Sequence, residues 1–140
     1  MKIIEIFIII LYGFVGFIAL IMAFKNIFSK TLLPFQEKAS STAWIEVDDK
    51  LQYVILTLMR ISGLGFLIIA FLLLVFPIVK YFKHDAFLMY SIPILSFVYC
   101  LGLFFANYSL HKHTRSKTPW RGSLFAIVAL LAGMIMSLFI

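Results

Sequence analysis

Charged side chains are scarce in this sequence. Only 13% of its 140 residues are Asp, Glu, Lys or Arg, about half the share of roughly 25% that soluble domains carry. Hydrophobic residues make up 64%, and the mean hydropathy is +1.09. This composition argues against a soluble domain and predicts a chain that lies in a lipid bilayer.

Cysteine and histidine are scarce as well. Cys100 is the single cysteine, so no disulfide can form within the chain. His111 and His113 look like a metal-binding pair, but zinc needs at least three protein ligands, and no cysteine or carboxylate lies near them in the sequence. No histidine lies inside an apolar block, where an axial haem ligand would be needed. We therefore expect no cofactor and no metal.

Catalytic motifs are also missing. The sequence has no glycine-rich phosphate loop and no serine with a histidine and a carboxylate in plausible geometry. The net charge of +6 could point to nucleic acid, but no basic groove or aromatic stacking platform is visible. Basic residues that flank membrane spans orient the helices and contact anionic lipid. We expect contact with anionic membrane lipids, and neither enzymatic activity nor nucleic-acid binding.

Four long apolar blocks are present, at about 3–24, 58–79, 87–110 and 120–140. A helix needs roughly 20 mostly apolar residues to cross the hydrocarbon core, and it satisfies its own backbone polar groups in lipid. The four blocks use most of the chain, so a separate soluble domain does not fit. The sequence predicts an all-α, polytopic membrane protein, with residues 1–140 forming a single four-transmembrane-helix bundle.

Basic residues are divided unevenly between the two sides of these spans. The first and third connections, at about 25–57 and 111–119, lie on the same side because two spans separate them. The positive-inside rule therefore places both connections in the cytoplasm and both termini outside. The basic residues at these connections are Lys25, Lys30, Lys38, Lys50, Lys112, Arg115, Lys117 and Arg121, against Lys2, Lys80 and Lys83 on the opposite side.

A polar segment precedes the second block. Ser40, Ser41 and Thr42 offer N-cap side chains, and the acidic residues from Glu46 onward suit a first helical turn. We expect a helix that begins between Thr42 and Glu46, lies partly at the interface and continues into the membrane. Pro93, in the first turns of the third block, is expected to bend the helix or to start its regular part.

Arg60 and Glu5 are candidate functional residues because charges within a membrane are usually functional. Arg60 lies at the cytoplasmic edge of the second span, where its side chain can snorkel to lipid phosphate. An ion pair with another helix and a site for an anionic ligand are the alternatives. Glu5 is expected to be a shallow carboxylate near the outer interface. The two residues belong near opposite faces of the membrane, so we do not expect them to pair.

The third span carries Ser96, Cys100 and Asn107 on roughly one face, with Tyr99 beside them. Such groups usually form hydrogen bonds between helices, worth about 0.6 kcal/mol each. The alternative is a polar stripe that lines a ligand or substrate cavity. The first interpretation is favoured because nothing in the stripe is charged, and Asn107 is kept as a candidate site residue.

Small residues recur along the last span at intervals of three or four. They let another backbone approach closely, and part of this seam must pack inside the bundle. The basic loop before the span is expected to contact anionic lipid or the acidic face of a partner. The seam consists of Gly122, Ala126, Ala129, Gly133 and Ser137, and the basic loop carries Lys112, Arg115, Lys117 and Arg121.

The first connection contains two apolar stretches, Leu32 to Phe35 and Trp44 to Ile45. They could dip into the membrane interface, or they could form a docking surface for another protein. The sequence does not separate these two interpretations.

The opening of the second span, Leu58 to Gly65 (LMRISGLG), is followed by a long apolar run. It resembles the corresponding segment of small bacterial DoxX-like and related four-helix membrane proteins. The entry to the last span, Lys117 to Trp120 (KTPW), is also similar to such families. The resemblance implies a four-helix bundle in a bacterial inner membrane and supplies no catalytic residues.

The leading functional hypothesis is a non-enzymatic accessory or structural subunit that associates with a larger membrane complex or with itself. It rests on the small-residue seam and on the scarcity of ionisable residues within the spans. A small oligomeric transporter or channel is the first alternative, with Arg60, Glu5 or Asn107 facing a water-accessible cavity. A lipid- or quinone-binding protein with an apolar cleft between its helices is the second.

Overall fold

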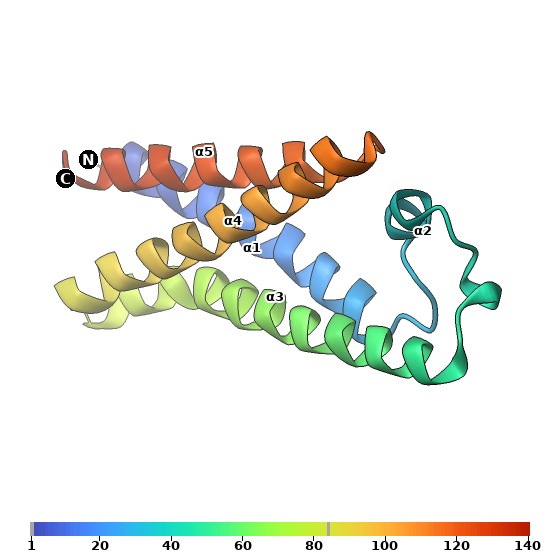
Figure 1. Ribbon diagram of the computed structural model, residues 1–140. Helices are drawn as coiled ribbons and strands as arrows, with labels where there is room; N and C mark the ends of the chain where they lie inside the picture. The colour runs from blue at the N-terminus through green and yellow to red at the C-terminus, as the bar shows by residue number, and fades with distance from the viewer. Residues whose placement is uncertain (1, 84) are drawn as a thin grey trace.

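Helices make up nearly all of the ordered secondary structure. The computed structural model describes residues 2–83 and 85–140, and no strand occurs within these ranges (Figure 1). Four long helices account for most of the chain, and a short helix and a 3-10 turn lie between the first two of them. The elements are α1 (Lys2–Ile27), α2 (Pro34–Ser40), the 3-10 turn η1 (Trp44–Glu46), α3 (Asp49–Lys83), α4 (Ala86–Thr114) and α5 (Trp120–Ser137).

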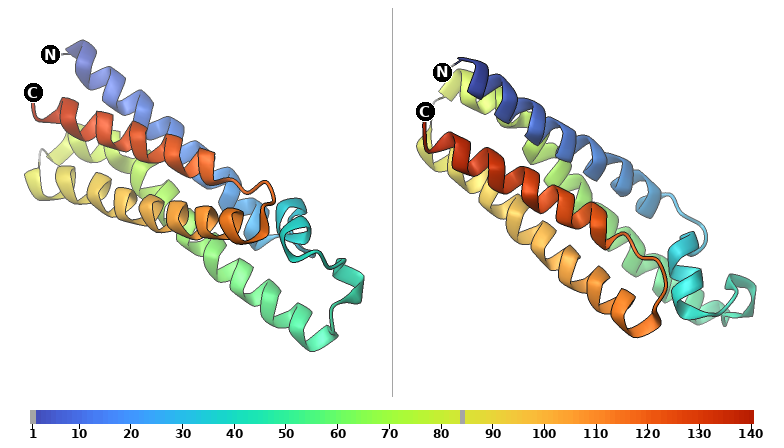
Figure 2. Two further views of the ribbon diagram at one scale, coloured as in Figure 1. Left: turned by 45° about the horizontal axis from the view of Figure 1, so that its top comes forward. Right: turned by 90° about the horizontal axis from the view of Figure 1, so that it is seen from above.

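The four long helices form an antiparallel bundle. Each helix packs on two neighbours, in the ring order α1, α3, α4, α5, and the α1–α3 contact is the most extensive. The beginning of α1 and the end of α5 lie at one end, which we call the termini end (Figures 1 and 2). The turn between α4 and α5 lies at the other, which we call the connection end, and α2 packs there against α4.

All four long helices are long and apolar enough to cross a membrane. At a rise of 1.5 Å per residue, the 26 residues of α1 extend about 39 Å and the 35 residues of α3 about 52 Å. The hydrocarbon core is about 30 Å thick, so α3 is much longer than one crossing requires. The bundle also exposes many large apolar side chains, among them Phe17, Ile68 and Val98, as contact with lipid requires.

Close approach of α1 and α3 depends on glycine at two positions. A Cβ atom on Gly16 would lie 3.1 Å from Cβ of Leu73, and one on Gly63 would lie 3.0 Å from Cβ of Asn26. Small residues allow this kind of backbone contact between helices in lipid. Asn26 is buried at this crossing, and its amide Nδ2 donates to the carbonyl oxygen of Met22 at 2.8 Å.

The start of α3 differs from the sequence-based expectation. The helix begins at Asp49, and the carboxylate of Asp48 accepts the backbone N–H of Lys50 at 3.3 Å. Ser41, expected to be an N-cap, instead ends α2 in the left-handed conformation with φ of 54°. Helix α2 is not predicted by the apolar stretch that contains Pro34, although proline suits the first turn of a helix.

Proline does not interrupt the long helices. Pro77 lies within α3 and Pro93 lies within α4. Regular helix in α4 begins at Ala86, where the side chain of Asp85 accepts the N–H of Phe87 at 2.9 Å. The expectation that Pro93 would start the regular helix was therefore wrong, because an N-cap two turns earlier already does so.

Candidate functional site

A cavity of about 130 Å³ lies between the four long helices. Its walls are almost entirely apolar, and none of the residues that line it is charged. It occupies the half of the bundle nearest the connection end, because its border on α5 begins at Pro119. The lining residues are Val15, Ile18, Ala19 and Met22 on α1, Phe66 and Ile69 on α3, Tyr99, Cys100, Leu103 and Asn107 on α4, and Pro119, Gly122, Ser123 and Ala126 at α5.

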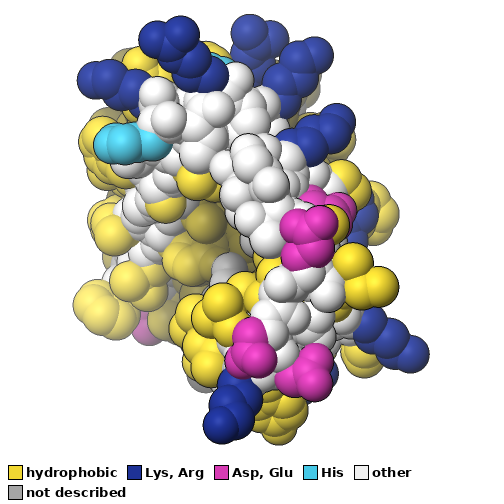
Figure 3. Space-filling view, turned by 45° about the vertical axis from the view of Figure 1, so that its right-hand side comes forward, with side chains coloured by type: hydrophobic (Ala, Val, Ile, Leu, Met, Phe, Trp, Pro, Cys, Tyr) yellow, Lys and Arg dark blue, Asp and Glu magenta, His cyan; other side chains and the backbone are white. Residues whose placement is uncertain are grey.

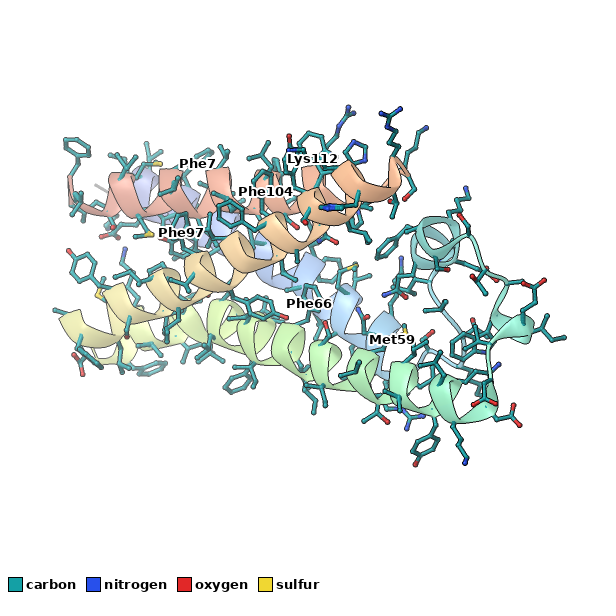
Figure 4. All side chains as sticks on the ribbon, in the orientation of Figure 1. Phe7, Met59, Phe66, Phe97, Phe104 and Lys112 are labelled. Atoms are coloured by element: carbon teal, nitrogen blue, oxygen red, sulfur yellow. The ribbon has the colours of Figure 1, made fainter. Side chains whose placement is uncertain are left out.

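Tyr99 joins two walls of the cavity. Its hydroxyl donates to the carbonyl oxygen of Ser62 on α3 at 3.4 Å, and its ring meets Phe66 edge-on, with 5.6 Å between the ring centroids. Figure 4 shows Phe66 in the space between α3 and α4. Gly65 makes room for this contact, since a Cβ there would lie 2.8 Å from the Tyr99 hydroxyl oxygen.

Hydrogen bonds fix the turn that borders the cavity at the connection end. The hydroxyl of Thr118 donates to the carbonyl oxygen of Asn107 at 2.8 Å, which ties α4 to the start of α5. Arg115 ends α4 with φ of 53°, and its N–H donates to the carbonyl oxygen of His111 at 2.8 Å. These bonds hold Asn107 and Pro119 at the edge of the cavity.

The two histidines near this turn do not face a common site. Nδ1 of His111 lies 2.6 Å from the carbonyl oxygen of Ser116, and Nδ1 of His113 lies 2.9 Å from that of Ser109. Among the described residues, no group of three His, Cys, Asp or Glu side chains is placed to hold a metal ion.

Aromatic side chains support the same turn from outside. Trp120 packs edge-on against Tyr108, with ring centroids 5.8 Å apart, and Phe104 stacks on Tyr108 at 5.7 Å (Figure 4 labels Phe104). The guanidinium of Arg121 lies 5.5 Å from the centre of the Trp120 ring. Such a cation–π contact holds the guanidinium of Arg121 against the ring of Trp120 at the start of α5.

The polar stripe predicted on the third span is divided. Tyr99, Cys100 and Asn107 line the cavity, as the cavity interpretation of the stripe required. Ser96 is fully buried but is not a lining residue, and its hydroxyl donates to the carbonyl oxygen of Ile92 in its own helix at 2.9 Å. The sequence reasoning favoured bonds between helices, and the Tyr99–Ser62 bond is one such interaction.

Glu5 and Arg60 lie outside the cavity. Glu5 forms an ion pair with Lys80 across the α1–α3 contact at the termini end, with 3.7 Å between Nζ and the carboxylate. The side chain of Lys80 is only 13% exposed. Arg60 is exposed on the outside of α3. Lys80 is not predicted as the partner of Glu5, because the pattern within each helix does not set the register between α1 and α3.

Most of the small-residue seam on α5 faces into the bundle. Ala129 and Gly133 are buried, and a Cβ on Gly133 would lie within 3.0 Å of the Tyr12 hydroxyl oxygen. Gly122 and Ala126 line the cavity. The hydroxyl of Ser137 donates to its own helix, at the carbonyl oxygen of Met134.

Comparisons with known proteins add nothing to this geometry: no family model, curated protein or solved structure matches the chain. The resemblance to DoxX-like proteins therefore stays a prediction.

Proposed function

We propose that this chain is a multi-pass membrane protein that holds an apolar part of a membrane molecule, such as a lipid chain or an isoprenoid tail, in the cavity between its helices. The single observation that carries the proposal is the cavity itself, with apolar walls contributed by all four long helices. Four helices of sufficient length and hydropathy support the membrane location.

The size and chemistry of the cavity support an apolar occupant. An engineered protein cavity of about 150 Å³ lined by aliphatic and aromatic side chains stays dry and binds benzene. The volume of about 130 Å³ here accommodates a ring of that size or a few carbons of a chain. Few lining residues have polar side chains, chiefly Tyr99, Asn107 and Ser123, and a few polar groups suit orientation of a ligand better than catalysis.

The other functional hypotheses have less support. The accessory-subunit hypothesis stays a prediction, but the seam that motivated it is largely occupied within the bundle by contacts such as Gly133 with Tyr12. A transporter or channel would need a polar, water-accessible path, and no charged residue lines the cavity.

Gly122→Leu is expected to abolish ligand binding without loss of the fold. A Cβ on Gly122 meets no neighbouring atom within 4 Å, so the new side chain has room to enter the cavity that Gly122 lines. Cys100 lines the same cavity and is the single thiol. We would measure its rate of reaction with N-ethylmaleimide, in neutral-lipid nanodiscs, with and without oleyl alcohol as the probe. The alcohol should slow the reaction in the unsubstituted protein and not in Gly122→Leu.

Gly102→Leu is the matched control for this experiment. Gly102 is an exposed helical glycine whose Cβ would also meet nothing within 4 Å, and it does not line the cavity. Its leucine variant should respond to oleyl alcohol as the unsubstituted protein does. If oleyl alcohol leaves the rate of Cys100 modification unchanged in the unsubstituted protein and in Gly102→Leu, the binding proposal is wrong.

For the orientation, we propose that the connection end lies in the cytoplasm of a bacterial cell and that both termini lie outside its inner membrane. The excess of basic residues at that end supports this arrangement. A cysteine introduced at exposed Lys38, in a Cys100→Ala background, should be protected from an impermeant maleimide in intact spheroplasts. One introduced at exposed Lys2 should react. If the cysteine at position 38 reacts and the one at position 2 is protected, the connection end lies outside and the termini lie in the cytoplasm.

A further inference from the structure

The basic residues of the connection end are distributed around the cavity border. Lys25 follows the lining residue Met22 by one helical turn on α1, and Arg60 precedes Phe66 by less than two turns on α3. Both side chains are exposed. Two of the four helices therefore carry an exposed basic residue within two turns of the cavity border.

The same arrangement holds on α4 and α5. Lys112 follows Asn107 by about one and a half turns, while Lys117 and Arg121 lie two residues before and two residues after Pro119. All three basic side chains are exposed. Each of the four long helices thus carries an exposed basic residue within about two turns of the cavity border. Figure 4 shows one of them, Lys112, at this end of the bundle.

These cations have few acidic groups near them. No Asp or Glu follows residue 85 in the sequence, so α4, α5 and their connection carry positive charge alone. The acidic residues of the connection end all belong to the α1–α3 connection or the start of α3, and two of them bond to backbone N–H groups. Glu37 accepts from Trp44 at 3.0 Å, and Asp48 accepts from Lys50.

Figure 3 views this side of the molecule and shows most of the Lys and Arg side chains at the top, with others at the right and bottom, and a hollow below the top group whose depth is hydrophobic. The Asp and Glu side chains lie to one side and below. An apolar cavity next to an uncompensated cluster of cations matches a molecule with an apolar tail and a negative head.

We propose that the occupant is an anionic amphiphile whose chain enters the cavity and whose phosphate or carboxylate head lies at the α4–α5 turn, near Lys117 and Arg121, the two basic residues that flank the lining residue Pro119. This inference rests on the proposed function of the cavity. It adds the chemical class of the ligand and its orientation in the cavity, with the anionic head at the connection end. A basic residue near a membrane surface strengthens binding of an anionic group about fivefold, so several together discriminate strongly between charged and neutral molecules with the same chain.

The test compares oleyl phosphate with oleyl alcohol, which share a chain and differ in the charge of the head. In neutral-lipid nanodiscs, each is titrated against the rate at which N-ethylmaleimide modifies Cys100. The phosphate should protect Cys100 at a concentration at least about tenfold lower than the alcohol does. Arg121→Gln should reduce this preference about fivefold, through loss of one charge.

Lys50→Gln is the matched control, because Lys50 is an exposed lysine at the start of α3, beside Asp48 and Asp49. It should leave the preference unchanged. Equal protection by phosphate and alcohol would overturn the anionic-head inference and leave the cavity-binding proposal standing. Protection by neither compound would overturn both. If Arg121→Gln and Lys50→Gln reduce the preference for the phosphate equally, the preference arises from general surface charge. This result would also overturn the inference.

Discussion

Replacing Gly133 with leucine is expected to lower the free energy of unfolding by about 1–3 kcal/mol. Gly133 is buried on α5, and a Cβ there would lie within 3.0 Å of the Tyr12 hydroxyl oxygen. Tyr12 cannot yield easily, because its side chain is 1% exposed and its ring packs edge-on against Phe76 at 4.9 Å. The variant must therefore move α5 away from α1 or displace the ring.

The measurement is the temperature at which half of the detergent-purified protein no longer elutes in the monodisperse peak. Gly102→Leu is again the control, since it makes the same replacement at a helical position with open space around Cβ. A second test combines Gly133→Leu with Tyr12→Ala. The double variant should be more stable than the sum of the two single losses predicts, because the leucine fills space left by the ring. A Gly133→Leu protein as stable as Gly102→Leu would contradict the described α1–α5 contact.

Removal of the charge on Glu5 is expected to cost more stability than removal of the charge on Lys80. Glu5→Gln leaves the ammonium of Lys80, which is 13% exposed, without its partner. A buried polar group that loses its partner costs about 1–3 kcal/mol. Lys80→Gln leaves the carboxylate of Glu5, which is 35% exposed and therefore better placed to recover contact with water or lipid head groups.

The double variant Glu5→Gln with Lys80→Gln distinguishes an ion pair from two independent effects. If the charges interact, the double variant should be more stable than Glu5→Gln alone, because no unpaired ammonium remains. Thermal stability in detergent provides the measurement, and Lys38→Gln, at an exposed position on α2, serves as the control. Losses that simply add would show that the two side chains do not depend on each other.

The long helices could be predicted from the sequence because apolar length is a strong local signal. Blocks of about 20 apolar residues are visible without any knowledge of the neighbours. The start of α3 was harder to place, since Ser40, Ser41 and Thr42 all favour N-caps in isolation. The competing helix α2, which begins at Pro34, places Ser41 at its end instead.

The candidate site could be predicted only in part. Cys100 and Asn107 were recognised as polar residues on one face of a span, and both line the cavity. The cavity also depends on Gly122 and Met22 from other helices, and single-span periodicity does not say which faces meet. The partner of Glu5 was missed for the same reason: Lys80 lies opposite it only in the antiparallel register that Gly16 and Gly63 allow.

The ring order of the helices has a consequence for biosynthesis. Helix α5 leaves the ribosome after the other three, and it alone closes the ring between α4 and α1. Until it docks, the cavity that Cys100 and α1 line lacks its fourth wall. A nascent chain halted before Trp120 would thus have three of the four long helices and an incomplete cavity. Under the proposed function, docking of the final helix is therefore the step that completes the binding cavity.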